Sequence, residues 1–380
     1  MNKKRKSKKI ISLMSGTSCD SIDVGFCVVK PDFSCTLIDG FNYEYPVSIQ
    51  KRIFKMFHDD ANIKEICQMN FIIAKCFANA ANEMIKRQGI PDFISSHGQT
   101  IYHYPFDTIS EKISERSTLQ IGDISVISQN TKCDVVGNFR TADMAKGGNG
   151  APLVCFADEK WFKPLNKNIA IQNIGGISNV TVISKNIATF GFDTGVGNIM
   201  LDYCAKKFFN EKYDKNAELA IQGKCSKSWL ECLLQDEYYF KEPPKTTGRE
   251  YFSKNYIENA LKSAPENKYD IMATLTALTA KTIAQAYERF VFPCVDIAEV
   301  ILGGGGAYNP LIKKFLKEYL PKNIELKTHE DYSISNNFKE VSAFALLGYC
   351  NYYNIPNNVP SCTGADMPVV MGQWSKYKNR

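Results

Sequence analysis

Residues 10–30, IISLMSGTSCDSIDVGFCVVK, place a turn of small polar residues between two apolar segments. Residues 10–16 predict a short strand, and residues 22–30 predict a second strand that ends before Pro31. Main-chain N–H groups in a turn of small residues can approach a phosphate closely. The stretch therefore predicts a hairpin whose turn is a candidate phosphate-binding loop.

A similar arrangement returns in the second half of the chain. Residues 168–186, NIAIQNIGGISNVTVISKN, hold an apolar strand, a turn at Gly175 and Gly176, and a β-branched strand. One such unit at the start of each half predicts an internally duplicated fold, although glycine hairpins are common and the repeat could be a coincidence.

Helical patterns separate the strands. Apolar residues recur at steps of three and four in five segments that we expect to be helices: residues 61–88, 199–210, 271–290, 309–320 and 338–353. Alternation of strands and helices indicates an α/β protein, and 380 residues favour two domains. We expect domain I to comprise residues 10–167 and about 345–380, and domain II to comprise residues 168–344.

Composition excludes several classes of protein. The net charge of +6 is matched by six basic side chains in residues 1–9, MNKKRKSKK, which we expect to form a disordered tail. The remainder is electrically balanced, so we expect no nucleic-acid partner. No apolar run is long enough to span a membrane, and the run after the tail is too short for a signal peptide, so we expect a cytoplasmic protein.

The thirteen cysteines lack the close spacing of a metal site. We expect reduced thiols that act as small buried hydrophobic residues at Cys27, Cys67, Cys76, Cys204 and Cys232.

Carboxylates lie beside two of the glycine turns. In the first turn Asp20 or Asp23 could hold Mg²⁺ opposite bound phosphates, or the turn could satisfy only its own backbone groups. Asp193 in FDTGVGN, residues 192–198, ends a strand before a helix and is placed to act as a general base. The alternative there is an ordinary helix cap.

Four further segments are candidate ligand contacts. Residues 302–310, LGGGGAYNP, form an open turn against which adenine or ribose could lie, although glycine runs can also be linkers. The other three segments are polar strand ends earlier in the chain: SSHGQT (95–100), LQIGD (119–123) and FRTADMAKGGNGAPLV (139–154). Hydroxyls, amides and an arginine suit a polyhydroxyl substrate that carries a carboxylate, although His97 could be a structural histidine and Arg140 with Asp143 a structural ion pair.

Taken together, these motifs closely resemble those of the anhydro-N-acetylmuramic acid kinases, from Ile10 to Trp374. The matching segments are MSGTSCDSID (14–23), SHGQT (96–100), LQIGD, FRTADMAKGGNGAPLV, QNIGGISNVT (172–181), FDTGVGN, PPKTTGREYF (243–252), TLTALTAKTIA (274–284), LGGGGAYNP, KEVSAFALLG (339–348) and NVPSCTGAD (358–366). The resemblance implies a duplicated two-domain actin-like ATPase fold, ribonuclease H-like, with ATP and Mg²⁺ in an interdomain cleft and a homodimeric assembly.

The resemblance also implies roles for individual residues. Asp193 would be the catalytic base. The sugar-binding residues would be His97, Gly98, Arg140, Asp143 and Glu340. ATP would contact Gly16, Thr17, Ser18, Cys19, Asp20, Ser21, Ile22, Asp23, Gly175, Gly176, Gly303, Gly304, Gly305 and Asn309, with Asp20 or Asp23 on the metal.

The chain departs from the family pattern at three positions: Ser21 stands where Gly is usual, Val196 where Pro is usual, and Val341 where Ala is usual. The implied reaction is hydrolytic opening of 1,6-anhydro-N-acetylmuramic acid with phosphorylation of its 6-oxygen, in peptidoglycan recycling. The alternatives are a kinase of the same fold for an ordinary hexose or short carboxylic acid, and a non-catalytic nucleotide switch.

Overall fold

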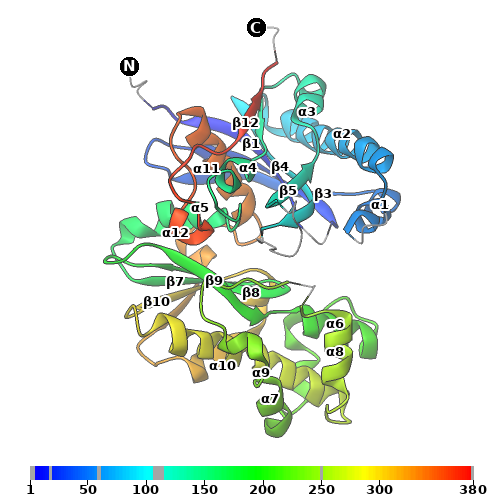
Figure 1. Ribbon diagram of the computed structural model, residues 1–380, viewed down its shortest axis with the longest axis vertical. Helices are drawn as coiled ribbons and strands as arrows, with labels where there is room; N and C mark the ends of the chain where they lie inside the picture. The colour runs from blue at the N-terminus through cyan, green and yellow to red at the C-terminus, as the bar shows by residue number, and fades with distance from the viewer. Residues whose placement is uncertain (1–4, 17–18, 58–60, 106–114, 249–250, 378–380) are drawn as a thin grey trace. The chain divides into compact units, whose positions relative to one another are not determined.

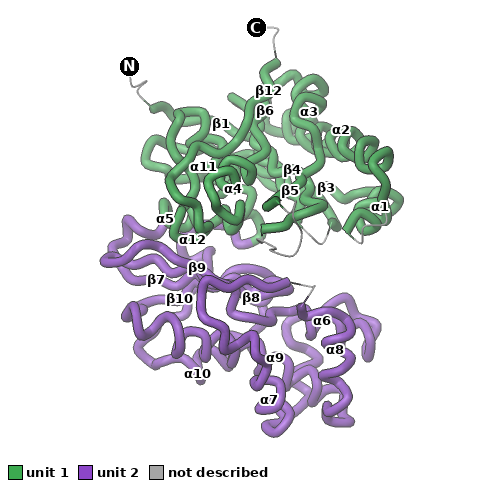
Figure 2. The backbone as a smooth tube through the Cα atoms, viewed as in Figure 1, with its two compact units in different colours: residues 1–161, 337–380 green, residues 162–336 purple. Residues whose placement is uncertain are grey.

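The computed structural model describes residues 5–16, 19–57, 61–105, 115–248 and 251–377 (Figure 1). Thr17 and Ser18 of the predicted ATP loop lie outside these ranges. The chain divides into two compact units, residues 1–161 with 337–380 and residues 162–336 (Figure 2). The expected domain boundaries lie a few residues later in the chain, and Glu340, which we had placed in domain II, belongs to the first unit.

Unit 1 is built on a seven-stranded sheet in the order β12-β6-β4-β1-β2-β3, with β5 paired to β4. Its strands are β1 (Lys8–Ser15), β2 (Ser21–Val29), β3 (Cys35–Glu44), β4 (Phe93–Tyr104), β5 (Ser117–Ile121), β6 (Val135–Gly137) and β12 (Gln373–Ser375). Its helices are α1 (Val47–Phe57), α2 (Ile63–Gln88), α3 (Ile124–Thr131), α4 (Thr141–Met144), α5 (Val154–Phe162, which reaches the unit boundary), α11 (Lys339–Tyr352) and α12 (Pro360–Thr363).

Unit 2 is built on a five-stranded sheet in the order β11-β10-β7-β8-β9. Its strands are β7 (Ile169–Ile174), β8 (Ile177–Ile183), β9 (Phe190–Val196), β10 (Glu299–Gly303) and β11 (Glu325–Thr328). Its helices are α6 (Ile199–Phe209), α7 (Lys227–Leu233), α8 (Lys254–Leu261), α9 (Lys268–Ala286) and α10 (Pro310–Tyr319). A π-helical turn, η5 (Tyr287–Val291), follows α9.

The two sheets repeat one topology, which confirms the predicted duplication. In unit 1, β1, β2 and β3 are antiparallel neighbours, and β4 and β6 follow in parallel on the other side of β1. In unit 2, β7, β8 and β9 repeat the antiparallel set, and β10 and β11 repeat the parallel pair. This shared order is the ribonuclease H-like arrangement expected of a duplicated actin-like fold.

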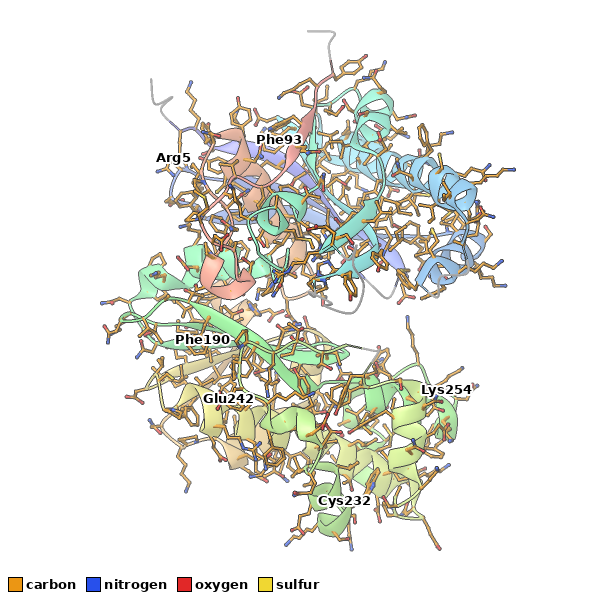
Figure 3. All side chains as sticks on the ribbon, viewed as in Figure 1. Arg5, Phe93, Phe190, Cys232, Glu242 and Lys254 are labelled. Carbon is orange, nitrogen blue, oxygen red and sulfur yellow. The ribbon has the colours of Figure 1, made fainter. Side chains whose placement is uncertain are left out.

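Alternation along β1 gives the unit 1 sheet two apolar faces. Ile11 packs into a core with α1, α2 and α3, whereas Ile10 packs into a second core with α5 and α11. Successive strand residues point to opposite faces, so both faces of this buried strand carry apolar side chains. Figure 3 shows side chains filling the interior of each unit, with Phe93 on β4 and Phe190 on β9 labelled.

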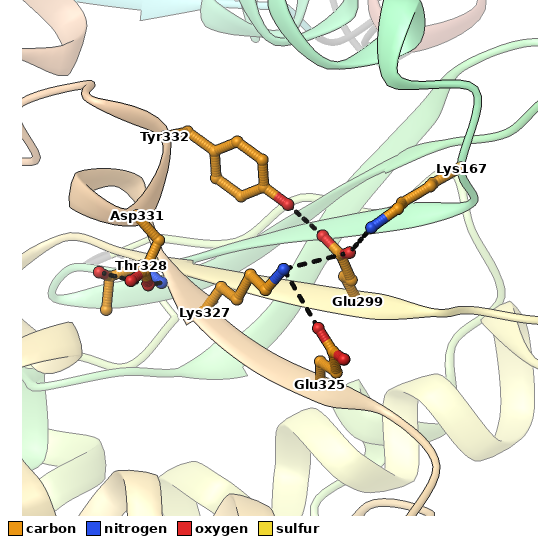
Figure 4. Close-up of polar contacts among 7 residues, drawn as sticks. All are labelled: Lys167, Glu299, Glu325, Lys327, Thr328, Asp331 and Tyr332. Carbon is orange, nitrogen blue, oxygen red and sulfur yellow. Dashed lines mark hydrogen bonds and ion pairs between the residues drawn. The ribbon is translucent and has the colours of Figure 1, made fainter.

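An ionic cluster lies at the N-terminal ends of the parallel strands of the unit 2 sheet (Figure 4). Glu299, 2% exposed, accepts hydrogen bonds from Lys167, Tyr332 and Lys327, and Lys327 also pairs with Glu325. Glu299 is the first residue of β10, at the opposite end of the strand from the glycine turn. The cluster therefore neutralises a buried carboxylate and is structural.

The structure confirms the predicted hairpins and helices with shifts of a few residues, and it corrects two other expectations. Residues 5–9 are ordered: the Lys6 N–H donates to the Tyr353 hydroxyl at 2.8 Å, and β1 already begins at Lys8. Cys67 and Cys232 are exposed, not buried, because they lie on the outer faces of their helices. Within the described ranges, no helix is long and apolar enough to cross a bilayer.

Candidate active site

Two buried polar side chains support the turn between β1 and β2. The Ser15 hydroxyl donates to Gln99 Oε1 at 2.6 Å, and Gln99 Nε2 lies 3.3 Å from the Gly16 carbonyl oxygen. Cys19 takes a left-handed conformation, with φ of 54°, and its N–H donates to the same carbonyl at 3.2 Å. These hydrogen bonds thus hold Ser15, Gly16 and Cys19 in place.

The two predicted metal ligands, Asp20 before β2 and Asp23 within it, have different surroundings. Asp20 is exposed, whereas Asp23 is half-buried and accepts a hydrogen bond from Asn42 Nδ2 at 2.5 Å. Desolvation raises the pKa of Asp23, and the hydrogen bonds from Asn42 and Ser21 offset part of this effect. Mg²⁺ needs only one or two protein carboxylates when substrate phosphates supply other oxygens. The donor set therefore fits the metal, and the choice between the two aspartates stays a prediction.

His97, which is buried within β4, pairs with the partly buried Arg140. His97 Nε2 lies 3.1 Å from Arg140 Nη2 and 3.3 Å from Nε, and His97 Nδ1 lies 2.9 Å from the Gly98 carbonyl oxygen. Arginine can only donate, so Nε2 accepts and Nδ1 carries the proton. Burial, reinforced by the Arg140 charge, lowers the pKa of His97 to about 3. His97 is therefore neutral and orients the guanidinium group.

Glu340, at the start of α11, belongs to the same charged group. Its side chain is accessible to solvent, yet much protein surrounds it. Desolvation by this protein raises the pKa of Glu340, and repulsion from the Asp23 charge raises it further. Lys339 and Arg140 act in the opposite direction. Burial lowers the pKa of Arg140 to about 10, and Glu340 partly offsets this. Unit 1 thus brings Asp23, Arg140 and Glu340 into electrostatic contact.

Asp143 is fully buried and serves its own loop. Its Oδ1 accepts from Asn358 Nδ2 at 2.8 Å and from the Thr363 hydroxyl at 2.7 Å, and its Oδ2 accepts from the Gly150 N–H at 2.9 Å. Both oxygens are occupied by the protein. Asp143 therefore shapes the loop after Arg140, and its contact with sugar stays a prediction. The structure does not show an ion pair between Asp143 and Arg140.

A cavity of about 310 Å³ opens beside His97 within unit 1. The Ser96 hydroxyl, in its wall, is buried without a hydrogen-bond partner among the described residues. Polar side chains from four elements and from adjoining loops line the rest, including Asn70, Thr118, Gln120, Asp123, Asn138, Thr141 and Gln373. A polar recess of this size suits a substituent of a sugar.

In unit 2, Asp193 lies in the middle of β9 rather than at the end of a strand, and residues about fifty positions later hold it. Its N–H donates to the Lys245 carbonyl oxygen at 3.1 Å, and its Oδ2 accepts from the Thr247 N–H at 2.8 Å. The Tyr238 hydroxyl donates to the Asp193 carbonyl oxygen at 2.9 Å. Asp193 does not cap a helix. A carboxylate fixed in this way is preorganised to take a proton.

The Gly175–Gly176 turn is tied to the start of α6. The N–H of Asn198 donates to the Gly175 carbonyl oxygen at 2.7 Å, and the Gly197 N–H donates to that of Gly176 at 2.9 Å. A Cβ on Gly197 would lie 2.2 Å from the Gly175 carbonyl oxygen. The second glycine of the FDTGVGN motif is therefore required by close main-chain packing.

The glycine turn after β10 combines packed and open positions. Gly304 has a φ of 74°, and its N–H donates to Asn336 Oδ1 at 2.9 Å. Gly305 is exposed and has only ordinary contacts, so it is open to a ligand. The side chain of Asn309 caps α10 by accepting from the N–H groups of Leu311 and Ile312 at 3.0 Å, and its contact with ATP stays a prediction.

A family model described as anhydro-N-acetylmuramic acid kinase matches residues 8–377. The chain belongs to this family. Curated proteins named anhydro-N-acetylmuramic acid kinase are similar throughout: one from Caldanaerobacter subterraneus subsp. tengcongensis is 41% identical over 98% of this chain and 98% of its own length. A protein of that name from Clostridioides difficile is 38% identical over 95% of this chain and 97% of its own length. Another from Francisella tularensis subsp. novicida is 38% identical over 96% of this chain and 98% of its own length.

Among solved structures, component A of (R)-2-hydroxyglutaryl-CoA dehydratase from Acidaminococcus fermentans is similar over 91% of this chain and 98% of its own. Identity is 13% and the TM-score is 0.45, a similarity too distant to add to the family assignment.

The departures from the anhydro-N-acetylmuramic acid kinase pattern are accommodated without strain. Ser21 does not have a positive φ, because Cys19 takes the left-handed position of the turn. Val196 is buried in a core of unit 2. Val341 faces Gly25, where a Cβ would lie 2.4 Å from its Cγ1. None of the three removes a charged or hydrogen-bonding group.

Sequence reasoning missed several residues that hold the family's site together. Lys245, Thr247 and Tyr238 position Asp193, Gln99 supports the first turn, and Asn336 supports the glycine turn after β10. Lys245 and Thr247 lie in the PPKTTGREYF motif, residues 243–252, whose resemblance to the family assigns no role to these two residues. The predicted residues fall into two sets, one in each unit, and the interdomain cleft stays a prediction.

Proposed function

We propose that this chain phosphorylates 1,6-anhydro-N-acetylmuramic acid with ATP while water opens the anhydro bridge, giving N-acetylmuramic acid 6-phosphate and ADP. The observation that carries the proposal is membership of the anhydro-N-acetylmuramic acid kinase family over residues 8–377. We also propose that the protein works in the cytoplasm, in peptidoglycan recycling, and as a homodimer, as the family resemblance implies.

Asp193 is the proposed base. Its carboxylate takes a proton from a water molecule that attacks the anomeric carbon, and the bond from that carbon to the bridging 6-oxygen breaks. The freed 6-oxygen attacks the γ-phosphoryl group, and ADP leaves. Because Thr247 holds one carboxylate oxygen, the base needs little reorganisation before it reacts.

Unit 1 supplies the groups proposed to orient the sugar. Arg140 presents a guanidinium group that His97 holds in place, and its charge suits the lactyl carboxylate of the substrate. Glu340 is the proposed hydrogen-bonding partner for sugar hydroxyls. Mg²⁺, held by Asp20 or Asp23, would neutralise phosphate charge when bound.

The test is incubation with ATP, Mg²⁺ and a panel of sugars in ¹⁸O-labelled water, followed by mass spectrometry. We expect a phosphosugar only from the anhydro form, with one ¹⁸O at the anomeric carbon. Phosphorylation of an ordinary hexose without label would indicate a sugar kinase of another specificity. ATP hydrolysis with no phosphosugar from any member of the panel would indicate a nucleotide switch.

A further inference from the structure

Lys245 carries a positive charge in the interior of unit 2. Its side chain is 6% exposed, and Nζ donates to the Tyr238 carbonyl oxygen at 3.3 Å. Nζ also lies 4.7 Å from the ring centroid of Phe290, 4.9 Å from that of Tyr238 and 5.8 Å from that of Phe192. Lysine is rarely buried without a partner, and three aromatic faces offset only part of the cost of desolvating its charge.

The main chain at the same residue holds the proposed base. The Lys245 carbonyl oxygen accepts the Asp193 N–H, and two residues later the Thr247 N–H donates to the Asp193 carboxylate. The rings of Phe192, Tyr238 and Phe290 form an aromatic cage around the Lys245 ammonium group. Phe192 directly precedes Asp193 in β9. The side chain that fills the cage and the backbone that clamps the carboxylate therefore belong to one segment.

The charges around Lys245 come from three elements. Asp193 lies on β9, Lys241 follows the short helix Glu237–Phe240, and Arg289 lies on the π-helical turn η5. Arg289 also fixes this region, because its Nη1 donates to the Tyr239 carbonyl oxygen at 3.1 Å. π-Helical turns often mark functional sites, and this one supplies both Arg289 and Phe290.

We infer that Lys245 is a positioning residue for Asp193: its caged ammonium anchors the segment that donates to the carboxylate and places a positive charge near it. The inference rests on the proposed function, in which Asp193 is the base. A purely structural anchor would be served as well by an unbranched apolar side chain, which fills the same cage without desolvating a charge.

Burial lowers the pKa of Lys245 to about 8. Arg289 contributes to the lowering, Asp193 opposes it, and Lys241 adds a smaller effect in the same direction as Arg289. The ammonium therefore loses its proton within the range in which the enzyme can be assayed. Arginine at the same position would stay charged throughout that range.

The test compares Lys245→Met and Lys245→Arg with wild type by steady-state kinetics between pH 6 and about 9.5, with thermal melting to verify folding. For Lys245→Met we expect kcat to fall roughly 10–100-fold with little change in KM for ATP or sugar, as for a displaced catalytic group. For wild type we expect kcat to fall above pH about 8, and for Lys245→Arg we expect this decline to disappear. Lys268→Met, which removes an exposed lysine stacked on Phe209 and Tyr269, is the matched control and should match wild type.

Wild-type kcat in folded Lys245→Met would overturn the inference. If Lys245→Met does not fold, an unchanged decline near pH 8 in Lys245→Arg overturns it instead. Failure of the proposed function is distinguishable, because wild type would then leave the anhydro sugar unphosphorylated. The same variants would in that case be compared on whichever acceptor, sugar or water, the wild type uses.

Discussion

Asp193 combines a fixed backbone with a carboxylate that is held on one oxygen by the Thr247 N–H. Asp193→Asn keeps the shape of the side chain and an oxygen for that hydrogen bond, but an amide cannot take a proton from water. We expect kcat to fall by roughly 10²–10⁴, with the affinity for ATP unchanged. Initial rates and calorimetric titration with ATP measure the two quantities. Near-normal turnover in the purified variant would remove Asp193 from the catalytic role.

His97 makes folding stability depend on pH. Its folded pKa of about 3 is below the ordinary value of 6.5, so between these values the unfolded chain binds a proton that the folded chain does not. The contribution of His97 is therefore complete above pH 6.5 and is lost as pH falls towards 3, at up to about 1.4 kcal/mol for each pH unit.

His97→Gln keeps a side-chain oxygen that can accept from Arg140 and removes the titration. Urea unfolding at pH 7 and pH 5 measures the difference. We expect wild type to lose about 2 kcal/mol more stability than the variant over this interval. His103, whose pKa burial lowers to about 4, titrates in both proteins and cancels in the comparison. Equal losses would show that His97 is protonated in the folded protein.

The glycine turn after β10 offers a matched pair of substitutions. Gly305 is exposed and does not have a positive φ, so alanine fits without strain. We expect Gly305→Ala to leave the melting temperature unchanged or slightly raised. If adenosine lies against this turn, the Kd for ATP rises about 10-fold, or about 1.4 kcal/mol.

Gly306→Ala is the contrasting variant. A Cβ there would lie 2.3 Å from Ile174 Cγ2, so we expect a loss of about 1–3 kcal/mol from overpacking. Melting curves and ATP titration separate the two effects. Unchanged ATP affinity in Gly305→Ala would mean that the nucleotide does not contact this residue.

The elements that the sequence predicted well are those whose signals are local. Turn residues between β-branched runs marked the two hairpins, and three- and four-residue spacing marked α2, α9 and α11. The roles of Asp143 and Asn309 depended instead on which partners lie within hydrogen-bonding distance. Asn358 and Thr363 are more than 200 positions from Asp143, and no spacing rule predicts that contact.

The segment that holds Asp193 could not be derived from local pattern for the same reason. Thr247 acts through its main-chain N–H, which any residue except proline provides, so its identity carries no signal. For Lys245 the sequence did hold a signal. This lysine directly follows two prolines within a motif that matches the family, and such a lysine is an unusual residue to find in the interior of a protein.

Duplication gives the molecule two separate interiors. In the described residues, four hydrophobic cores are present, two within unit 1 and two within unit 2, and each draws its members from a single unit. The chain crosses between units only after Trp161 and after Asn336. Because packing energy is local to a core, a cavity in one unit should weaken that unit first.

Two buried isoleucines test this independence. Ile283 on α9 and Ile73 on α2 are both 0% exposed, one in a unit 2 core and the other in a unit 1 core. We expect either change to alanine to cost about 2–5 kcal/mol locally. Hydrogen exchange should show faster exchange in residues 162–336 for Ile283→Ala and in the remaining residues for Ile73→Ala. Equal acceleration of both units in each variant would mean that the duplicated halves unfold as one cooperative body, with the two cores energetically coupled.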